Sequence, residues 1–122
     1  MRPGEVIERF AALLAAGDAR QALALYERDA AFAVEPGTIV RGHEAIGPAL
    51  EGFAALRPAL SNDIEQVVCA GDLALVTNRW TLDGTAGDGQ PVHLEGRSSD
   101  VLRRTSDGDW KIAIDDPWGG AS

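Results

Sequence analysis

The sequence predicts an α+β fold in which helices cover one face of a curved, mostly antiparallel sheet. Apolar residues in the N-terminal half recur at three- and four-residue spacing, as on amphipathic helices. The C-terminal half instead has alternating segments separated by Gly- and Asp-rich turns, which is typical of a strand meander. A chain of 122 residues fits one domain, so we expect a single domain over residues 1–122.

Three helices are expected in the N-terminal half. Residues 3–18 have the helical spacing of apolar side chains, and Pro3 suits a first turn. A second helix is predicted over residues 18–29, with Tyr26 on its apolar face. A third is predicted over residues 43–56. The short connection between the first two helices indicates a helical hairpin.

The remaining elements are predicted as strands. A short pair flanks the Pro-Gly turn at residues 36–37, and the later strands are long enough for an antiparallel meander. The expected strands cover residues 30–35, 38–41, 63–70, 73–82, 91–105 and 110–115.

Composition excludes several classes of partner. The net charge of −8 disfavours nucleic acid and anionic membranes. No apolar run approaches the ~18 residues of a membrane span, and the N-terminus lacks a secretory apolar core. A lone cysteine, Cys69, rules out an internal disulfide framework, so a cytoplasmic location is expected.

Strand alternation assigns candidate pocket residues. Asp100 and Ser98 share one strand face, and Asn78 and Trp80 share another that is otherwise apolar. Trp80 and Trp118 are suited either to stacking on a flat ligand or to ordinary core packing. Asp100 is either a pocket acid or a structural acid bonded to a neighbouring hydroxyl or arginine. The residues expected to line a pocket are Phe10, Tyr26, Phe32, Asn78, Trp80, Ser98 and Trp118.

Metal and cofactor motifs are not found in the sequence. The histidines and nearby acids have no spacing typical of a metal site, and there is no Gly-rich phosphate loop or nucleophile elbow. We therefore expect no metal and no cofactor. The residue types that could in principle ligate a metal occur at His43, His93, Glu95, Asp115 and Asp116.

Five segments carry a family resemblance: "LYERDAAFAVEPG", "VRGHEAI", "GDLALVTNRWTL", "DVLRRTSDGDWKI" and "DDPW". With their order, the chain resembles the SnoaL-like and ketosteroid-isomerase-like families of the nuclear transport factor 2-like superfamily. The resemblance covers nearly the whole chain. It implies a cone-shaped, cystatin-like barrel in which a strongly curved sheet wraps three helices and leaves an apolar pocket.

The resemblance also implies roles for two acids. Glu35 before Pro36 is similar to the general base of the isomerases, and Asp100 is similar to their protonated oxyanion donor. The tyrosine of the family's first helix is replaced by Phe10, which cannot donate a hydrogen bond. Counting from the preceding helix puts the base position at Val34, whereas counting from the turn puts it at Glu35. A one-residue slip reverses the face of a strand side chain, so both positions stay open.

Three functions are compatible with these observations. The first is a cofactor-independent isomerase or polyketide-cyclase-like enzyme that acts by proton transfer on an apolar carbonyl compound. The second is a protein that binds an apolar small molecule without chemistry, and the third is a protein-interaction module of the same fold. In each case we expect a homodimer formed through the sheet.

Overall fold

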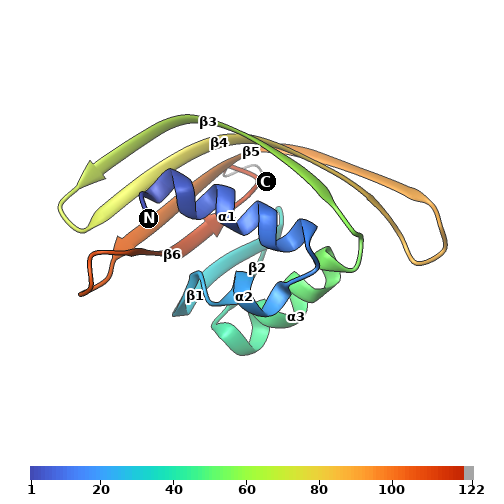
Figure 1. Cartoon of the computed structure of the whole chain (residues 1–122), viewed down its shortest axis with the longest axis horizontal. Helices are drawn as coiled ribbons and strands as arrows, with labels where there is room; N and C mark the ends of the chain where they lie inside the picture. The colour runs from blue at the N-terminus through green and yellow to red at the C-terminus, as the bar shows by residue number, and fades with distance from the viewer. Residues whose placement is uncertain (120–122) are drawn as a thin grey trace.

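The computed structural model describes residues 1–119 and has the expected α+β architecture. Three helices lie against the concave side of one six-stranded sheet (Figure 1). The helices are α1 (Pro3–Ala15), α2 (Ala19–Leu23) and α3 (His43–Ala54). The strands are β1 (Tyr26–Glu35), β2 (Thr38–Arg41), β3 (Ala59–Ala70), β4 (Leu73–Thr85), β5 (Pro91–Arg104) and β6 (Trp110–Asp116).

The sheet is curved but open. Its strand order is β2-β1-β6-β5-β4-β3, so β2 and β3 are edges. All neighbouring strands are antiparallel except β1 and β6, which are parallel. No helix of the described residues is long and apolar enough to cross a bilayer.

The second helix is much shorter than the sequence pattern predicts. Asp18 caps it by accepting a hydrogen bond from the Gln21 backbone at 3.0 Å, and it ends at Leu23. Residues 26–29, predicted as helix, form the start of β1, where Tyr26 pairs with Ile112 of β6. The prediction of a helix over residues 18–29 was wrong because pairing with a strand far along the chain outweighs local helix propensity.

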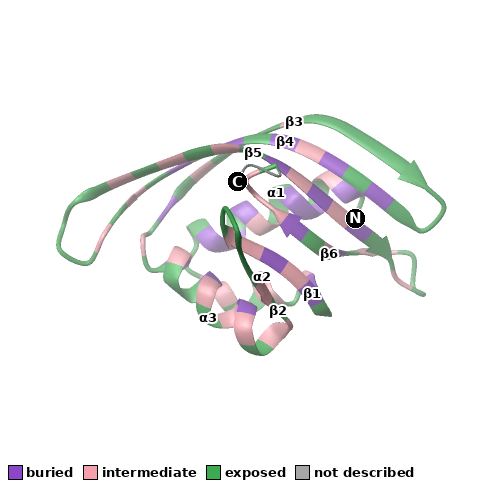
Figure 2. Cartoon of the chain, turned by 180° about the vertical axis from the view of Figure 1, so that it is seen from behind, coloured by how far each residue is buried: buried purple, intermediate pink, exposed green. Residues whose placement is uncertain are grey.

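Alternation of buried and exposed residues along β4 and β5 fixes which side chains face the helices (Figure 2). Val76, Asn78 and Trp80 on β4 are buried, as are Ser98 and Asp100 on β5. The core under the sheet also includes large side chains from the helices and from β1, β5 and β6: Val6, Tyr26, Ile46, Leu50, Leu102 and Ile112. The inner face of the sheet is therefore largely apolar, with a few polar positions that need an explanation.

Candidate functional site

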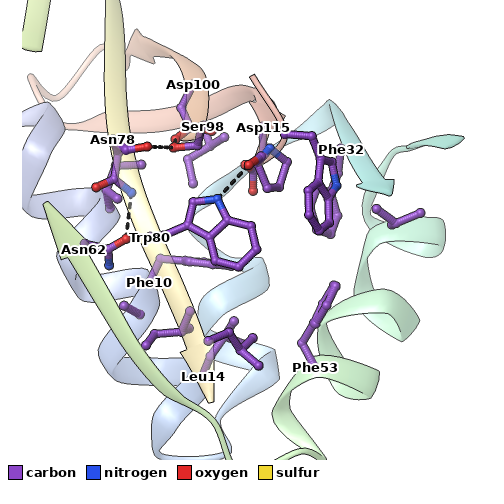
Figure 3. A pocket seen from close by; sticks show the side chains of 18 residues that line it. Phe10, Leu14, Phe32, Phe53, Asn62, Asn78, Trp80, Ser98, Asp100 and Asp115 are labelled. Atoms are coloured by element: carbon purple, nitrogen blue, oxygen red, sulfur yellow. Dashed lines mark hydrogen bonds between the residues drawn. The ribbon is translucent and has the colours of Figure 1, made fainter. Parts of the chain in front are cut away.

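A cavity lies between α1, α3 and the inner face of the sheet (Figure 3). Its volume is about 80 Å³. A single water needs a cavity of ~10–15 Å³, whereas pockets for drug-sized ligands hold ~300 Å³ or more. The cavity therefore has the size for a small molecule rather than for a large fused-ring compound.

Most of the expected pocket residues line this cavity. They are Phe10, Phe32, Asn78, Trp80, Ser98 and Trp118, and the predicted catalytic residue Asp100 lines it too. Tyr26 does not line it, but its hydroxyl reaches a lining residue, Asp115. Polar side chains gather at one end of the pocket, and Leu14 and Phe53 lie at the other (Figure 3).

The polar end is a continuous stripe across four strands, formed by Asn62, Asn78, Ser98, Asp100 and Asp115, which we call the polar stripe. The Asn78 amide donates to Asn62 Oδ1 at 2.7 Å. The Ser98 hydroxyl lies 3.2 Å from Asp100 Oδ2 and 3.4 Å from the Asn78 carbonyl oxygen. Because buried polar groups are costly unless they are hydrogen-bonded, so long a stripe in an apolar wall is the candidate site for contact with a ligand.

Asp100 and Asp115 form a buried carboxyl pair. They are direct cross-strand partners on β5 and β6, and their side chains are only 3% and 8% exposed. Burial, together with the nearby charge of Asp115 and a hydrogen bond to it, raises the pKa of Asp100 well above its ordinary value. Burial also raises the pKa of Asp115, although hydrogen bonds from Asp100 and Tyr26 oppose that rise.

One proton would satisfy both carboxyl groups of this pair. Two buried carboxylates in contact repel each other, and a proton on Asp100 converts the repulsion into a hydrogen bond. Asp100 Oδ1 is buried and has no hydrogen-bond partner in the described part of the chain, so it is the atom where that proton is best accommodated. The burial of the pair and the raised pKa of Asp100 thus suit these two groups to hold one proton between them at the wall of the cavity.

Tyr26 orients Asp115, the second member of the pair. Its hydroxyl donates to Asp115 Oδ2 at 2.5 Å, and its ring is fully buried, edge-on to Phe10 with centroids 5.7 Å apart. Burial and the charge of Asp115 raise the pKa of Tyr26 well above its ordinary value, so the phenol stays protonated and remains a donor. The first helix has no tyrosine that could donate a hydrogen bond to the carboxyl pair, and Tyr26 on β1 is the donor instead.

Glu35 lies outside the cavity. It is exposed at the end of β1, where it accepts a hydrogen bond from Thr38 Oγ1 at 3.2 Å. Val34 lines the cavity instead, and the register of β1 against β2 shifts between Ala33 and Glu35. The structure therefore does not bring Glu35 together with Asp100.

Asp115 was not among the predicted catalytic residues. If the β5–β6 hairpin is paired regularly from its turn, Ile114 and not Asp115 comes opposite Asp100. The register, however, shifts between Val101 and Leu102, so Asp115 could not be reached by counting back from the turn.

Within the described part of the chain, no three His, Cys, Asp or Glu residues are placed to hold a metal ion.

Replacing Tyr26 by phenylalanine should destabilise the protein by about 1–3 kcal/mol near pH 8, because a buried carboxylate loses its donor. The phenol favours the ionised form of Asp115, so the penalty should shrink as pH falls through the raised pKa of Asp115. Urea unfolding at about pH 8 and about pH 5 measures the loss in free energy of unfolding at each pH. The loss caused by Tyr26→Phe should also be smaller in a protein that already carries Asp115→Asn. An equal cost at both pH values and in both backgrounds would show that the hydroxyl does not act on Asp115.

Comparison with known proteins gives a family and a fold. A sequence-family model described as the SnoaL-like domain matches residues 7–113. A search of curated proteins found no match. Among solved structures, a ketosteroid isomerase-like protein from Erwinia carotovora atroseptica has a TM-score of 0.79 and 19% identity, over 91% of this chain and 88% of that chain.

Two further structures are similar at the same level. A conserved protein from Planctomyces limnophilus has a TM-score of 0.80 at 19% identity, covering 91% of this chain and 88% of that one. An NTF2-like protein with a cystatin-like fold from Novosphingobium aromaticivorans has a TM-score of 0.73 at 23% identity, covering 91% and 75%. At these identities the likeness shows a shared fold.

Proposed function

The chain belongs to the SnoaL-like domain family, and on that premise we propose that it is a cofactor-independent enzyme of proton transfer. Its substrate is a small, largely apolar carbonyl compound that undergoes isomerisation or cyclisation in the cavity. The observation that carries the proposal is the buried Asp100–Asp115 pair, which offers a proton donor and a proton acceptor side by side. The ketosteroid isomerase-like neighbour fits this class by its description.

The two carboxyl groups have complementary tasks. Asp115 removes a proton from the carbon next to the carbonyl, while Asp100 turns its O–H toward the carbonyl oxygen and stabilises the enolate. Asp115 then returns its proton to a different carbon, and the pair ends with the single proton with which it began. A carboxylic acid kept neutral by an apolar site serves as this kind of donor in ketosteroid isomerase, and the same physical reasoning applies to Asp100.

The proposal is tested with cyclohex-3-enone, a single-ring ketone whose isomerisation to the conjugated enone is followed by ultraviolet absorbance. The unmodified protein should accelerate the conversion, and Asp100→Asn should lose at least about tenfold of the rate because the amide is a weaker acid. Glu35→Gln is the matched control and should keep the full rate, since Glu35 lies outside the cavity. A rate that depends on Glu35 and not on Asp100 would overturn this assignment.

A second function, binding without chemistry, is favoured by one observation. The ionised Asp115 already accepts hydrogen bonds from Tyr26 and Asp100, which weakens it as a base. A protein of this kind would bind the ring ketone with no isomerisation and no exchange of its α-hydrogens for deuterium. Deuterium exchange followed by NMR separates the two functions, because a working base exchanges these hydrogens even when isomerisation is slow.

We also propose that the outer face of the sheet joins two copies of the chain. Val68 and Leu75, direct partners on β3 and β4, are 46% and 42% exposed, and Leu73 is 42% exposed. Nearby on this face, Glu65 lies between Arg79 and Arg97, so the surface carries both charges and can complement its own copy.

Light scattering should therefore report twice the 12.9 kDa chain mass at micromolar concentration. Leu75→Lys should shift the protein toward monomer because it places a charge in the apolar centre of the face. Ile39→Lys, at an exposed apolar position on β2, should leave the dimer intact. A monomer at every concentration would exclude this interface.

A further inference from the structure

The turn after β6, residues 116–119, is built to lie over the cavity. Asp116 organises it, because its carboxylate accepts a hydrogen bond from the Trp118 backbone and its carbonyl accepts one from Gly119, both at 3.2 Å. The motif "DDPW" therefore forms both the end of β6 and the turn that follows it. It reverses the chain so that Trp118 lines the same cavity as Asp115.

Two close approaches hold the turn against β4 and β5. The Trp80 indole N–H donates to the Pro117 carbonyl oxygen at 2.6 Å. Gly96 leaves the space for this contact, since a Cβ there would lie 3.0 Å from that oxygen and 3.1 Å from the Trp80 ring. Gly119, at φ +62°, leaves similar space, because a Cβ would lie 2.5 Å from the Arg97 carbonyl oxygen. The position of the turn is thus determined by backbone and ring contacts rather than by surface side chains.

Trp118 is the largest side chain of this turn. Its ring meets Trp80 edge-on, with centroids 5.3 Å apart and an interplanar angle of 72°. Its indole nitrogen is buried and has no hydrogen-bond partner in the described part of the chain. No hydrogen bond therefore holds the side chain, although it occupies space at the wall of a cavity of about 80 Å³.

We propose that Trp118 sets the size limit of the ligand, so that the site takes a single-ring carbonyl compound and rejects fused rings. The size limit follows from the cavity volume and the position of the Trp118 ring. The carbonyl part of the statement rests on the proposed function, because it is the Asp100–Asp115 pair that would recognise the oxygen.

The test compares two ketones that differ by one ring, cyclohexanone and 2-decalone. Binding is measured by calorimetry on the unmodified protein and on Trp118→Ala and Trp118→Phe. The unmodified protein should bind cyclohexanone and show at least about tenfold weaker binding of 2-decalone. Trp118→Ala should gain at least about tenfold for 2-decalone, because it removes the ring that fills that space. Trp118→Phe keeps an aromatic wall and should retain the preference for one ring.

Folding and function are separated by additional measurements. Melting temperatures identify a variant that fails through unfolding, and Trp118→Leu then replaces Trp118→Ala with the same expected gain. Equal binding of both ketones by the unmodified protein, or no gain in any folded smaller variant, would overturn the size limit. If a smaller variant at Trp118 gains affinity for 2-decalone while Asp115→Asn leaves the isomerisation rate unchanged, the size limit is supported. In that case only the proposed function fails.

Discussion

Asp115→Asn is expected to lower the isomerisation of cyclohex-3-enone by at least about 100-fold, the usual contribution of a positioned general base. The amide cannot accept the proton from carbon, yet it can still accept the Tyr26 hydrogen bond and donate to Asp100. The loss should therefore appear in kcat rather than in ligand affinity. Initial rates over a range of substrate concentrations give both quantities.

The comparison needs a variant that removes a carboxylate elsewhere. Glu35→Gln does so at an exposed position on the same protein, and its rate should match that of the unmodified chain. If Asp115→Asn retained the full rate and ligand affinity, Asp115 would have no part in proton transfer. The buried pair would then be a structural feature of the sheet.

Asp100→Asn is expected to be at least as stable as the parent near neutral pH. In the parent, ionising Asp100 costs folding free energy, because burial raises the pKa of this acid in the folded state. The stability that protonated Asp100 contributes is therefore fully present below the unfolded-state pKa of ~3.9. That stability is lost as the pH rises through the pKa of the folded state. Asparagine has no such loss and can still donate to Asp115. Melting temperatures from about pH 4 to about pH 8 should converge at the acid end and favour the variant increasingly toward pH 8, by roughly 3–6 °C per kcal/mol.

The opposite result has a clear meaning. A variant that is less stable than the parent at every pH would mean that Asp100 acts as an ionised structural acid. Asp63→Asn is a suitable control, because Asp63 is exposed on β3 and its loss should leave the pH dependence of the melting temperature unchanged. The measurement thus compares a buried and an exposed aspartate in the same sheet.

The parts of the fold that sequence predicts well are those with unbroken local patterns. The helix over residues 3–18 corresponds to α1, and the alternation on β4 and β5 correctly indicates that Asn78 and Asp100 face inward. Strand positions follow from two-residue periodicity as long as no register shift intervenes. This is why one member of the carboxyl pair could be identified in advance and assigned to the pocket side of its strand.

The remaining parts depend on contacts between distant segments. Tyr26 lies in a helical pattern, but parallel pairing of β1 with β6 extends the strand back to it. Register shifts on β1 and between β5 and β6 decide that Val34 faces inward rather than Glu35 and that Asp115 meets Asp100. A bulge changes the face of every later side chain and leaves little trace in the local sequence.

The central claim, one proton shared by Asp100 and Asp115 at the cavity wall, is tested most directly by NMR. The side-chain carboxyl carbons of the aspartates report ionisation as pH is raised, and the two resonances are assigned with Asp100→Asn and Asp115→Asn. We predict that the Asp100 carboxyl titrates well above the ordinary ~3.9 and that its titration shifts the Asp115 resonance as well. Two independent titrations, both near the ordinary value, would contradict the shared proton.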